Sequence, residues 1–196
     1  MDKATLSARF QALVAETFEP LSKAYGLRMS KTDSFSVRFD GHEVFVTVAY
    51  DALRSLELIA GIGLQAGVVR AVERPFQLSE LLRAVGQYSL PEAQMHEIVA
   101  RHDDLRSALE HLADVLTKYG QEALRGDRSL FSRLDSQRDL DCLRYQHDRD
   151  LGNASRAAFV AWSRGEYRTV VALLKPFEER LTADERQVLD AAEGRQ

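Results

Sequence analysis

Residues 34–48 read SFSVRFDGHEVFVTV, and this stretch decides the fold class. Before Asp40, every second residue is apolar, which is the pattern of a strand with one buried face. Asp40-Gly41 follows at once and is the strongest short signal for a β-hairpin. A two-residue loop at this point puts the apolar residues of both strands on one face. The predicted pairs are Phe35 with Val46, Val37 with Val44, Phe39 with His42 and, on the other face, Arg38 with Glu43.

The segments on either side of the hairpin extend this pattern. Between residues 6 and 21, apolar residues recur at spacings of three and four, which predicts an amphipathic helix that Pro20 should kink or end. Residues 56–64 continue the alternation and predict a further strand. Gly61 and Gly63 leave one face of this strand bare, so either another group packs closely there or the strand bends.

The rest of the chain has helical signals. A short helix is predicted over residues 79–85, ending at Gly86. A capping box at residues 89–92 then opens a long helix, whose apolar seam over residues 95–119 requires a partner helix. The charged helix expected over residues 129–150 is the natural antiparallel neighbour.

The last segment is predicted to hold three helices. Asn153 is a good N-cap for the first of them, Gly165 should end it, and Thr182 with Glu185 caps the third. Gly165-Glu-Tyr167, with small residues one turn before it, resembles the turn of a tetratricopeptide unit, and the resemblance covers residues 154–192. The resemblance implies a protein-binding scaffold, but stacks of such units need about three copies and only one is present. A lone helical hairpin that caps the core is the favoured interpretation.

These elements predict an α+β fold. An N-terminal helix and a small antiparallel meander sheet of three or four strands should be followed by a mostly helical half built from antiparallel helix hairpins. We expect residues 1–90 to hold the helix and sheet, and residues 91–196 to form the helical region, packed on the first as one compact body.

The composition excludes several classes of protein. The chain has 196 residues, a formal charge of -4 and one cysteine, Cys142, so neither an intrachain disulfide nor a CxxC metal site can form. Acidic and basic residues nearly balance along the chain, and we therefore expect no binding of nucleic acid. No signal peptide and no membrane span is expected, which favours a protein of the bacterial cytoplasm.

The sequence carries no recognisable catalytic motif, and we predict no cofactor and no metal site. His102 is the residue to watch, because it occupies a seam position among leucines, where it could be a ligand or a pH switch. A core histidine with a satisfied hydrogen bond is the commoner case. One alternative function is a metal-dependent hydrolase that uses His102, His147 and nearby acids. Another is an oligomerising structural protein whose 95–119 seam pairs between chains.

A protein-binding module is the leading hypothesis. Four residues around the Gly165 turn are of types enriched at interface hot spots, and we predict that they bind the partner: Trp162, Arg164, Tyr167 and Arg168. In the simpler alternative, Trp162 and Tyr167 only close the helical hairpin.

The whole chain also resembles the small proteins encoded beside bacterial toxins as immunity factors. The resemblance lies in the N-terminal helix reaching Tyr25-Gly-Leu27, the hairpin at Asp40-Gly41 and the closing helices at Gly-Glu-Tyr167. It implies that the protein partner is a toxin, neutralised by direct complex formation in which charge complementarity speeds association. It assigns no functional residue.

Overall fold

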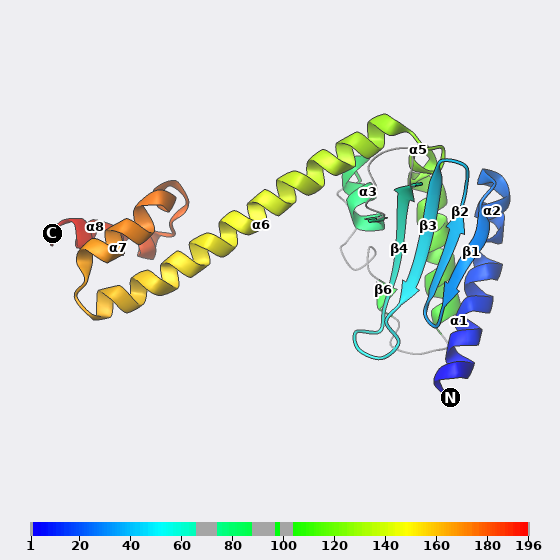
Figure 1. Cartoon of the computed structure of the whole chain (residues 1–196), viewed down its shortest axis with the longest axis horizontal. Helices are drawn as coiled ribbons and strands as arrows, with labels where there is room; N and C mark the ends of the chain where they lie inside the picture. The colour runs from blue at the N-terminus through cyan, green and yellow to red at the C-terminus, as the bar shows by residue number, and fades with distance from the viewer. Residues whose placement is uncertain (1, 66–73, 88–96, 99–103, 196) are drawn as a thin grey trace. The chain divides into compact units, whose positions relative to one another are not determined.

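The chain forms two compact units with separate hydrophobic cores. The structure, a computed structural model, describes residues 2–65, 74–87, 97–98 and 104–195. Unit 1 is Met1–Gln137 and unit 2 is Arg138–Gln196, and each contains its own cluster of buried apolar residues. The α+β class is confirmed (Figure 1). The division falls inside a helix, after Gln137, rather than at residue 90 as the sequence predicted.

Unit 1 is built on an antiparallel sheet. Four strands follow one another as a meander: β1 (Arg28–Asp33), β2 (Ser36–Asp40), β3 (Val44–Tyr50) and β4 (Glu57–Leu64). Two short strands pair with the other edge of β4: β5 (Phe76–Gln77) and β6 (Glu97–Ile98). The meander confirms the predicted sheet. The exposed edge strand β1 was not predicted, because its polar residues show no apolar alternation.

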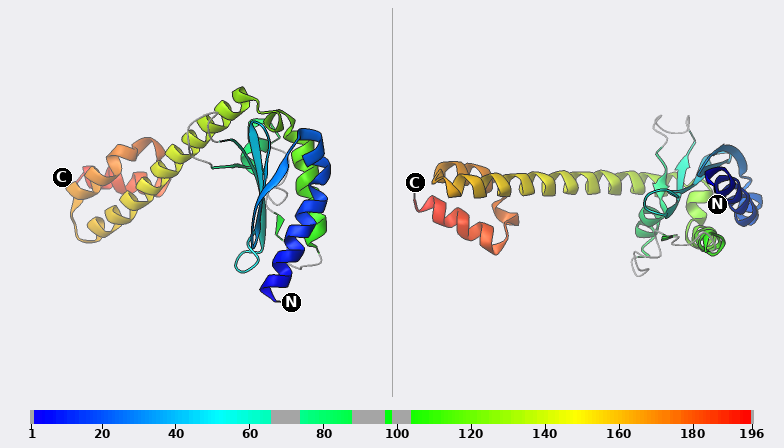
Figure 2. Two further views of the ribbon diagram at one scale, coloured as in Figure 1. Left: turned by 45° about the vertical axis from the view of Figure 1, so that its right-hand side comes forward. Right: turned by 90° about the horizontal axis from the view of Figure 1, so that it is seen from below.

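Two helices cover one face of this sheet. Helices α1 (Lys3–Thr17) and α4 (Leu105–Tyr119) lie side by side along it, as Figure 2 shows in its left view. Arg106 of α4 donates two hydrogen bonds of 2.8 Å to the carboxylate of Glu16 in α1, and these bonds lower the pKa of that carboxyl. Pro20 acts as predicted, since α1 ends before it and it lies in the first turn of α2 (Glu19–Tyr25).

The hairpin forms where it was predicted, but the predicted register is wrong. Three residues, beginning with Gly41, separate β2 from β3, and Phe39 therefore pairs with Val46 instead of His42. The observed register places an apolar residue opposite each apolar residue of the core face and leaves His42 in the loop. Because the shift is an even number of residues, the predicted buried face is still the correct one.

Arg38 pairs differently from the prediction as a consequence. It lies opposite Thr47 and not Glu43, and its Nε donates to Asp40 at 2.7 Å. Burial raises the pKa of Asp40, but hydrogen bonds from Ser30, Arg38 and Gln65 outweigh it, so the pKa of this carboxyl is lowered.

The predicted long helix before residue 119 is wrong in its first part. Ile98 lies in β6, and the described helix begins only at Leu105. The capping box at 89–92, Met95 and His102 lie outside the described residues. The rest of the seam packs against α1 and β4 and shares one buried core with the first residues of α6, so it is buried within unit 1 and is not free to pair between chains. Its buried leucines are Leu105, Leu109, Leu112 and Leu116.

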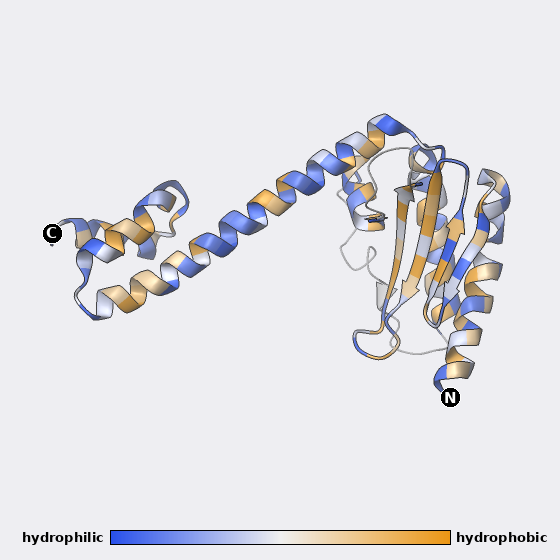
Figure 3. Cartoon of the chain, viewed as in Figure 1, coloured by the Kyte–Doolittle hydropathy of each residue, from blue (hydrophilic) through white to orange (hydrophobic). Residues whose placement is uncertain are grey.

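The predicted helix start at Asn153 is also wrong. Helix α6 runs from Arg128 to Ser163, with Gly152 and Asn153 in its interior. A glycine inside a helix costs about 1 kcal/mol relative to alanine, which the buried alanines on the following turns can offset by packing. Figure 3 shows that the middle of α6 is predominantly hydrophilic, and its residues from 142 to 150 are all exposed.

An aromatic ring packs against the glycine face of β4. This close packing is one of the two alternatives that the sequence predicted for Gly61 and Gly63. The ring of Phe45 lies against Gly63 so closely that a Cβ there would meet its Cζ atom at 2.6 Å. The guanidinium of Arg38 covers the same ring, 3.9 Å from its centroid. Glycine is therefore required at position 63 because the Phe45 ring of the neighbouring strand lies against its backbone, and not because of an unusual backbone angle.

Gly63→Ala should destabilise unit 1 by about 1–3 kcal/mol, because the added methyl group overpacks the Phe45 ring. Chemical unfolding followed by circular dichroism measures this cost. The loss should shrink when Gly63→Ala is made in a Phe45→Leu background, since the smaller side chain leaves room for the methyl group. An equal loss in both backgrounds would contradict this account of the glycine.

Candidate functional site

Unit 2 is a small helical bundle. It contains the end of α6, then α7 (Tyr167–Leu174), the 3-10 helix η2 (Lys175–Arg180) and α8 (Ala183–Glu193). Gly165, at a φ of 74°, makes the predicted turn between α6 and α7. The core is made of small and medium residues: Ala158, Ala161, Val170, Leu174, Leu181, Leu189 and Ala192. Ala158 and Ala161 are the contribution of α6 to this core.

One end of unit 2 is fixed by Glu185, which connects two of its helices. Its carboxylate accepts hydrogen bonds from Ser155 of α6 at 2.5 Å, and from the backbone N–H and hydroxyl of Thr182 at 2.9 Å. Thr182 and Glu185 thus form the predicted capping box of α8. The hydrogen bond from Ser155 is the largest cause that lowers the pKa of Glu185, followed by the bond from the Thr182 backbone. This carboxylate connects α6 to α8 and is ionised at neutral pH.

Contacts among Trp162, Tyr167 and Arg195 fix the opposite end, and we call these three residues the aromatic brace. The rings of Trp162 and Tyr167 meet edge to face with centroids 5.3 Å apart. The guanidinium of Arg195 lies 5.0 Å from the Trp162 ring and 5.2 Å from the Tyr167 ring, and donates to the Tyr167 hydroxyl at 3.0 Å. The aromatic pair therefore closes the turn between α6 and α7, as the simpler of the two sequence interpretations expected.

Between these two fixed ends lies an apolar groove of about 310 Å³. Its apolar wall consists of Ala158, Phe159 and Trp162 from α6, Leu174 from α7 and Val188 from α8. Its polar rim consists of Ser155, Asp184 and Glu185. We call this set of residues the unit 2 groove. Its volume is near the lower end of the roughly 300–1,000 Å³ range of ligand pockets, which suits side chains of a short segment.

Phe159 is the most unusual residue of the groove. Its side chain is 74% exposed, although it is one of the largest apolar side chains in unit 2. Ala158, its neighbour in the chain, occupies the position on α6 that faces the core and is 1% exposed. Phe159 points about 100° away from that position around the helix, so it lies at the groove instead of in the core.

The structure brings together only part of the predicted binding set. Trp162 lines the groove, and Tyr167 contacts the Trp162 ring without lining the groove itself. Arg164 and Arg168 are exposed and do not line it. Sequence reasoning missed Phe159, because the residue lies off the apolar stripe of its helix.

The residues considered for a metal site are engaged in other contacts. His147 and Asp148 both contact the guanidinium of Arg180, at the His147 Nδ1 atom and at a carboxylate oxygen of Asp148. The His147 ring also meets Phe177 edge to face. Across the described part of the chain, no three histidine, cysteine or acidic side chains gather as metal ligands would. The hydrolase alternative thus gains no support from His147, and His102 lies outside the described residues.

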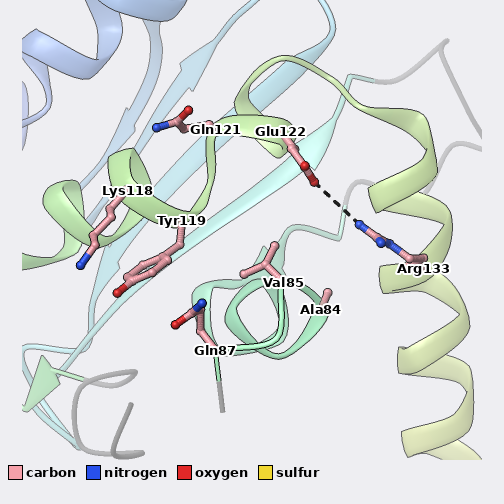
Figure 4. Close-up of a pocket in the computed structure, with 8 residues that line it drawn as sticks. All are labelled: Ala84, Val85, Gln87, Lys118, Tyr119, Gln121, Glu122 and Arg133. Carbon is pink, nitrogen blue, oxygen red and sulfur yellow. Dashed lines mark ion pairs between the residues drawn. The ribbon is translucent and has the colours of Figure 1, made fainter. Parts of the chain in front are cut away.

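Unit 1 also carries a hollow of about 480 Å³, shown in Figure 4. It is lined by Ala84, Val85, Gln87, Lys118, Tyr119, Gln121, Glu122 and Arg133. Figure 4 shows Lys118 and Arg133 on opposite sides of it, and Arg133 is already paired with Glu122 at 3.7 Å. The two cations do not converge on one point, so the lining does not define an anion site or a catalytic centre.

No family model, curated protein or solved structure matches the chain. Among the helices of the described residues, none is long and apolar enough to cross a membrane.

Phe159→Ala should change the free energy of unfolding of unit 2 by no more than about 0.5 kcal/mol, because the side chain is largely exposed. Leu189→Ala should cost about 2–5 kcal/mol, because Leu189 is fully buried. Trp162 is the only tryptophan, so urea unfolding followed by its fluorescence reports on unit 2. A large loss with Phe159→Ala would place that ring in the core and contradict the groove.

Lowering the pH should reduce the free energy of unfolding of unit 2, because Glu185 then becomes protonated. Because the pKa of this carboxyl is lower in the folded state than its ordinary value of 4.5, its contribution is complete above about pH 4.5 and declines as the pH falls through the folded value. Glu185→Gln should therefore be less stable than the wild type at neutral pH, and the difference should shrink in acid. Unfolding curves of both proteins, measured by Trp162 fluorescence from neutral to acidic pH, check this. A difference that is the same at every pH would contradict an ionised Glu185.

Proposed function

We propose that the chain is a protein-binding module whose partner docks in the unit 2 groove. The exposed Phe159 side chain carries this proposal. A large apolar side chain left in water beside an apolar groove loses the stabilisation that burial would give it, about 1.5–3 kcal/mol for a whole side chain. A partner that covers Phe159 recovers this free energy.

The rigidity of the groove supports the same function. One end of the groove is fixed by the Ser155–Glu185 hydrogen bond and the other end by the contacts among Trp162, Tyr167 and Arg195. A site that is ordered before binding avoids part of the entropy cost of association. Aromatic side chains at such a site are also the residue types that contribute most to binding energy at protein interfaces.

The proposal is tested by comparing two variants in affinity capture from the native lysate. The full chain is tagged and used as wild type, as Phe159→Ala and as Leu53→Ala. Leu53 is a matched control, because it is a large apolar residue that is 70% exposed but belongs to unit 1. A stoichiometric protein that is retained by wild type and Leu53→Ala but lost with Phe159→Ala is the expected result.

Two outcomes would overturn the proposal. In one, the captured protein is retained equally by Phe159→Ala, which would place its binding site elsewhere. In the other, the wild-type chain captures no stoichiometric protein at all. A folded Phe159→Ala variant, checked by its unfolding curve, is needed for either conclusion.

The narrower prediction that the partner is a toxin rests on the resemblance to immunity factors. It is tested on the captured protein itself. An equimolar amount of the wild-type chain should abolish the toxic activity, and Phe159→Ala should not. A captured partner without toxic activity would overturn the narrower prediction and leave the binding function standing.

A further inference from the structure

The charges around the unit 2 groove are of one sign. Two carboxylates, those of Asp184 and Glu185, belong to its rim. Among the described residues, no lysine, arginine or histidine lines the groove. The rim is therefore negative while the wall is apolar, although unit 2 as a whole carries acidic and basic residues in similar numbers.

Nearby basic residues are held in other contacts. Arg156, next to Ser155 on α6, donates to the side chain of Asn153 at 2.7 Å. Arg186, next to Glu185 on α8, donates to the backbone carbonyl of Glu178 at 2.9 Å. In these contacts, neither arginine donates a hydrogen bond to the carboxylates of Asp184 and Glu185. The negative charge of the rim is thus not neutralised by the arginines that follow the rim residues in the sequence.

The two carboxylates differ in what they can offer a ligand. Glu185 already accepts hydrogen bonds from Ser155 and Thr182, so its charge acts from a fixed position and most of its acceptor sites are used. Asp184 is exposed at the first turn of α8. It is the rim residue best placed to accept a charged hydrogen bond from a bound molecule.

We infer that the groove binds a peptide segment of its partner in which a bulky apolar side chain is followed or preceded closely by a lysine or arginine. The apolar side chain covers the ring of Phe159, and the cation lies at the rim beside Asp184. This inference rests on the proposed function, and it adds the chemical class of the segment that is bound. An acidic or purely apolar segment fits less well, because burial of the rim would leave two negative charges without a counter-charge.

The test is selection from a random-peptide phage library on the immobilised full chain. Enriched peptides should carry a bulky apolar residue with lysine or arginine within a few positions. Synthetic copies are then titrated against the chain, and the change of Trp162 fluorescence measures their affinity, since Trp162 lines the groove.

Two variants of α8 isolate the charge. Asp184→Asn should weaken binding of the selected peptides by about two- to fivefold, as expected for one exposed ion pair, and added salt should reduce this difference. Asp190→Asn removes another exposed carboxylate from the same helix but from outside the groove, and it should leave the affinity unchanged.

The outcomes separate this inference from the proposed function. Peptides that lack basic residues, or that bind Asp184→Asn as tightly as wild type, would overturn the inference while the groove remains a binding site. A failure to enrich any peptide would likewise overturn the inference, whereas selected peptides that bind Phe159→Ala as well as wild type would contradict the proposed function itself.

Discussion

The alanine face of α6 is the constraint on which unit 2 depends. Ala154, Ala158 and Ala161 are all buried, and each adds little volume to the core. Small side chains on one helix let its neighbours come close, because side-chain size sets the distance between helix axes. Phe159 follows Ala158 by one residue and therefore lies off this buried face, so its ring is left outside the core, at the groove.

Glu185 joins the stability of unit 2 to its candidate site. The same carboxylate caps α8, holds Ser155 of α6 and forms part of the groove rim. Its hydrogen bonds are charge-assisted, and these are among the stronger polar interactions in proteins. Because the rim residue Glu185 also caps α8, the groove should change shape little when a ligand enters. The hydrogen bonds of Glu185 therefore serve both folding and binding. Unit 1 supplies a separate, well-packed sheet, in which Phe45 against Gly63 is the corresponding close contact.

Much of the fold could be predicted because local patterns and packing agree there. Alternation around Asp40-Gly41 located the hairpin and its buried face, whereas its register depends on how the loop packs and was missed. Strand β1 was missed because it is a polar edge strand, exposed along its whole length. Asn153 looks like a helix start, but the buried alanines after it keep α6 continuous. The groove could not be predicted at all, since Ser155 and Glu185 lie thirty residues apart and only the folded chain joins them.

Hydrogen–deuterium exchange of the complete chain, alone and bound to the partner captured from its native lysate, tests the central claim most directly. Backbone amides are protected where a partner covers or stiffens the chain. We expect added protection in residues 155–162 of α6 and 184–188 of α8, which line the groove, and little change across the sheet of unit 1. Protection confined to unit 1, with unit 2 exchanging as in the free chain, would contradict a docking site in the groove.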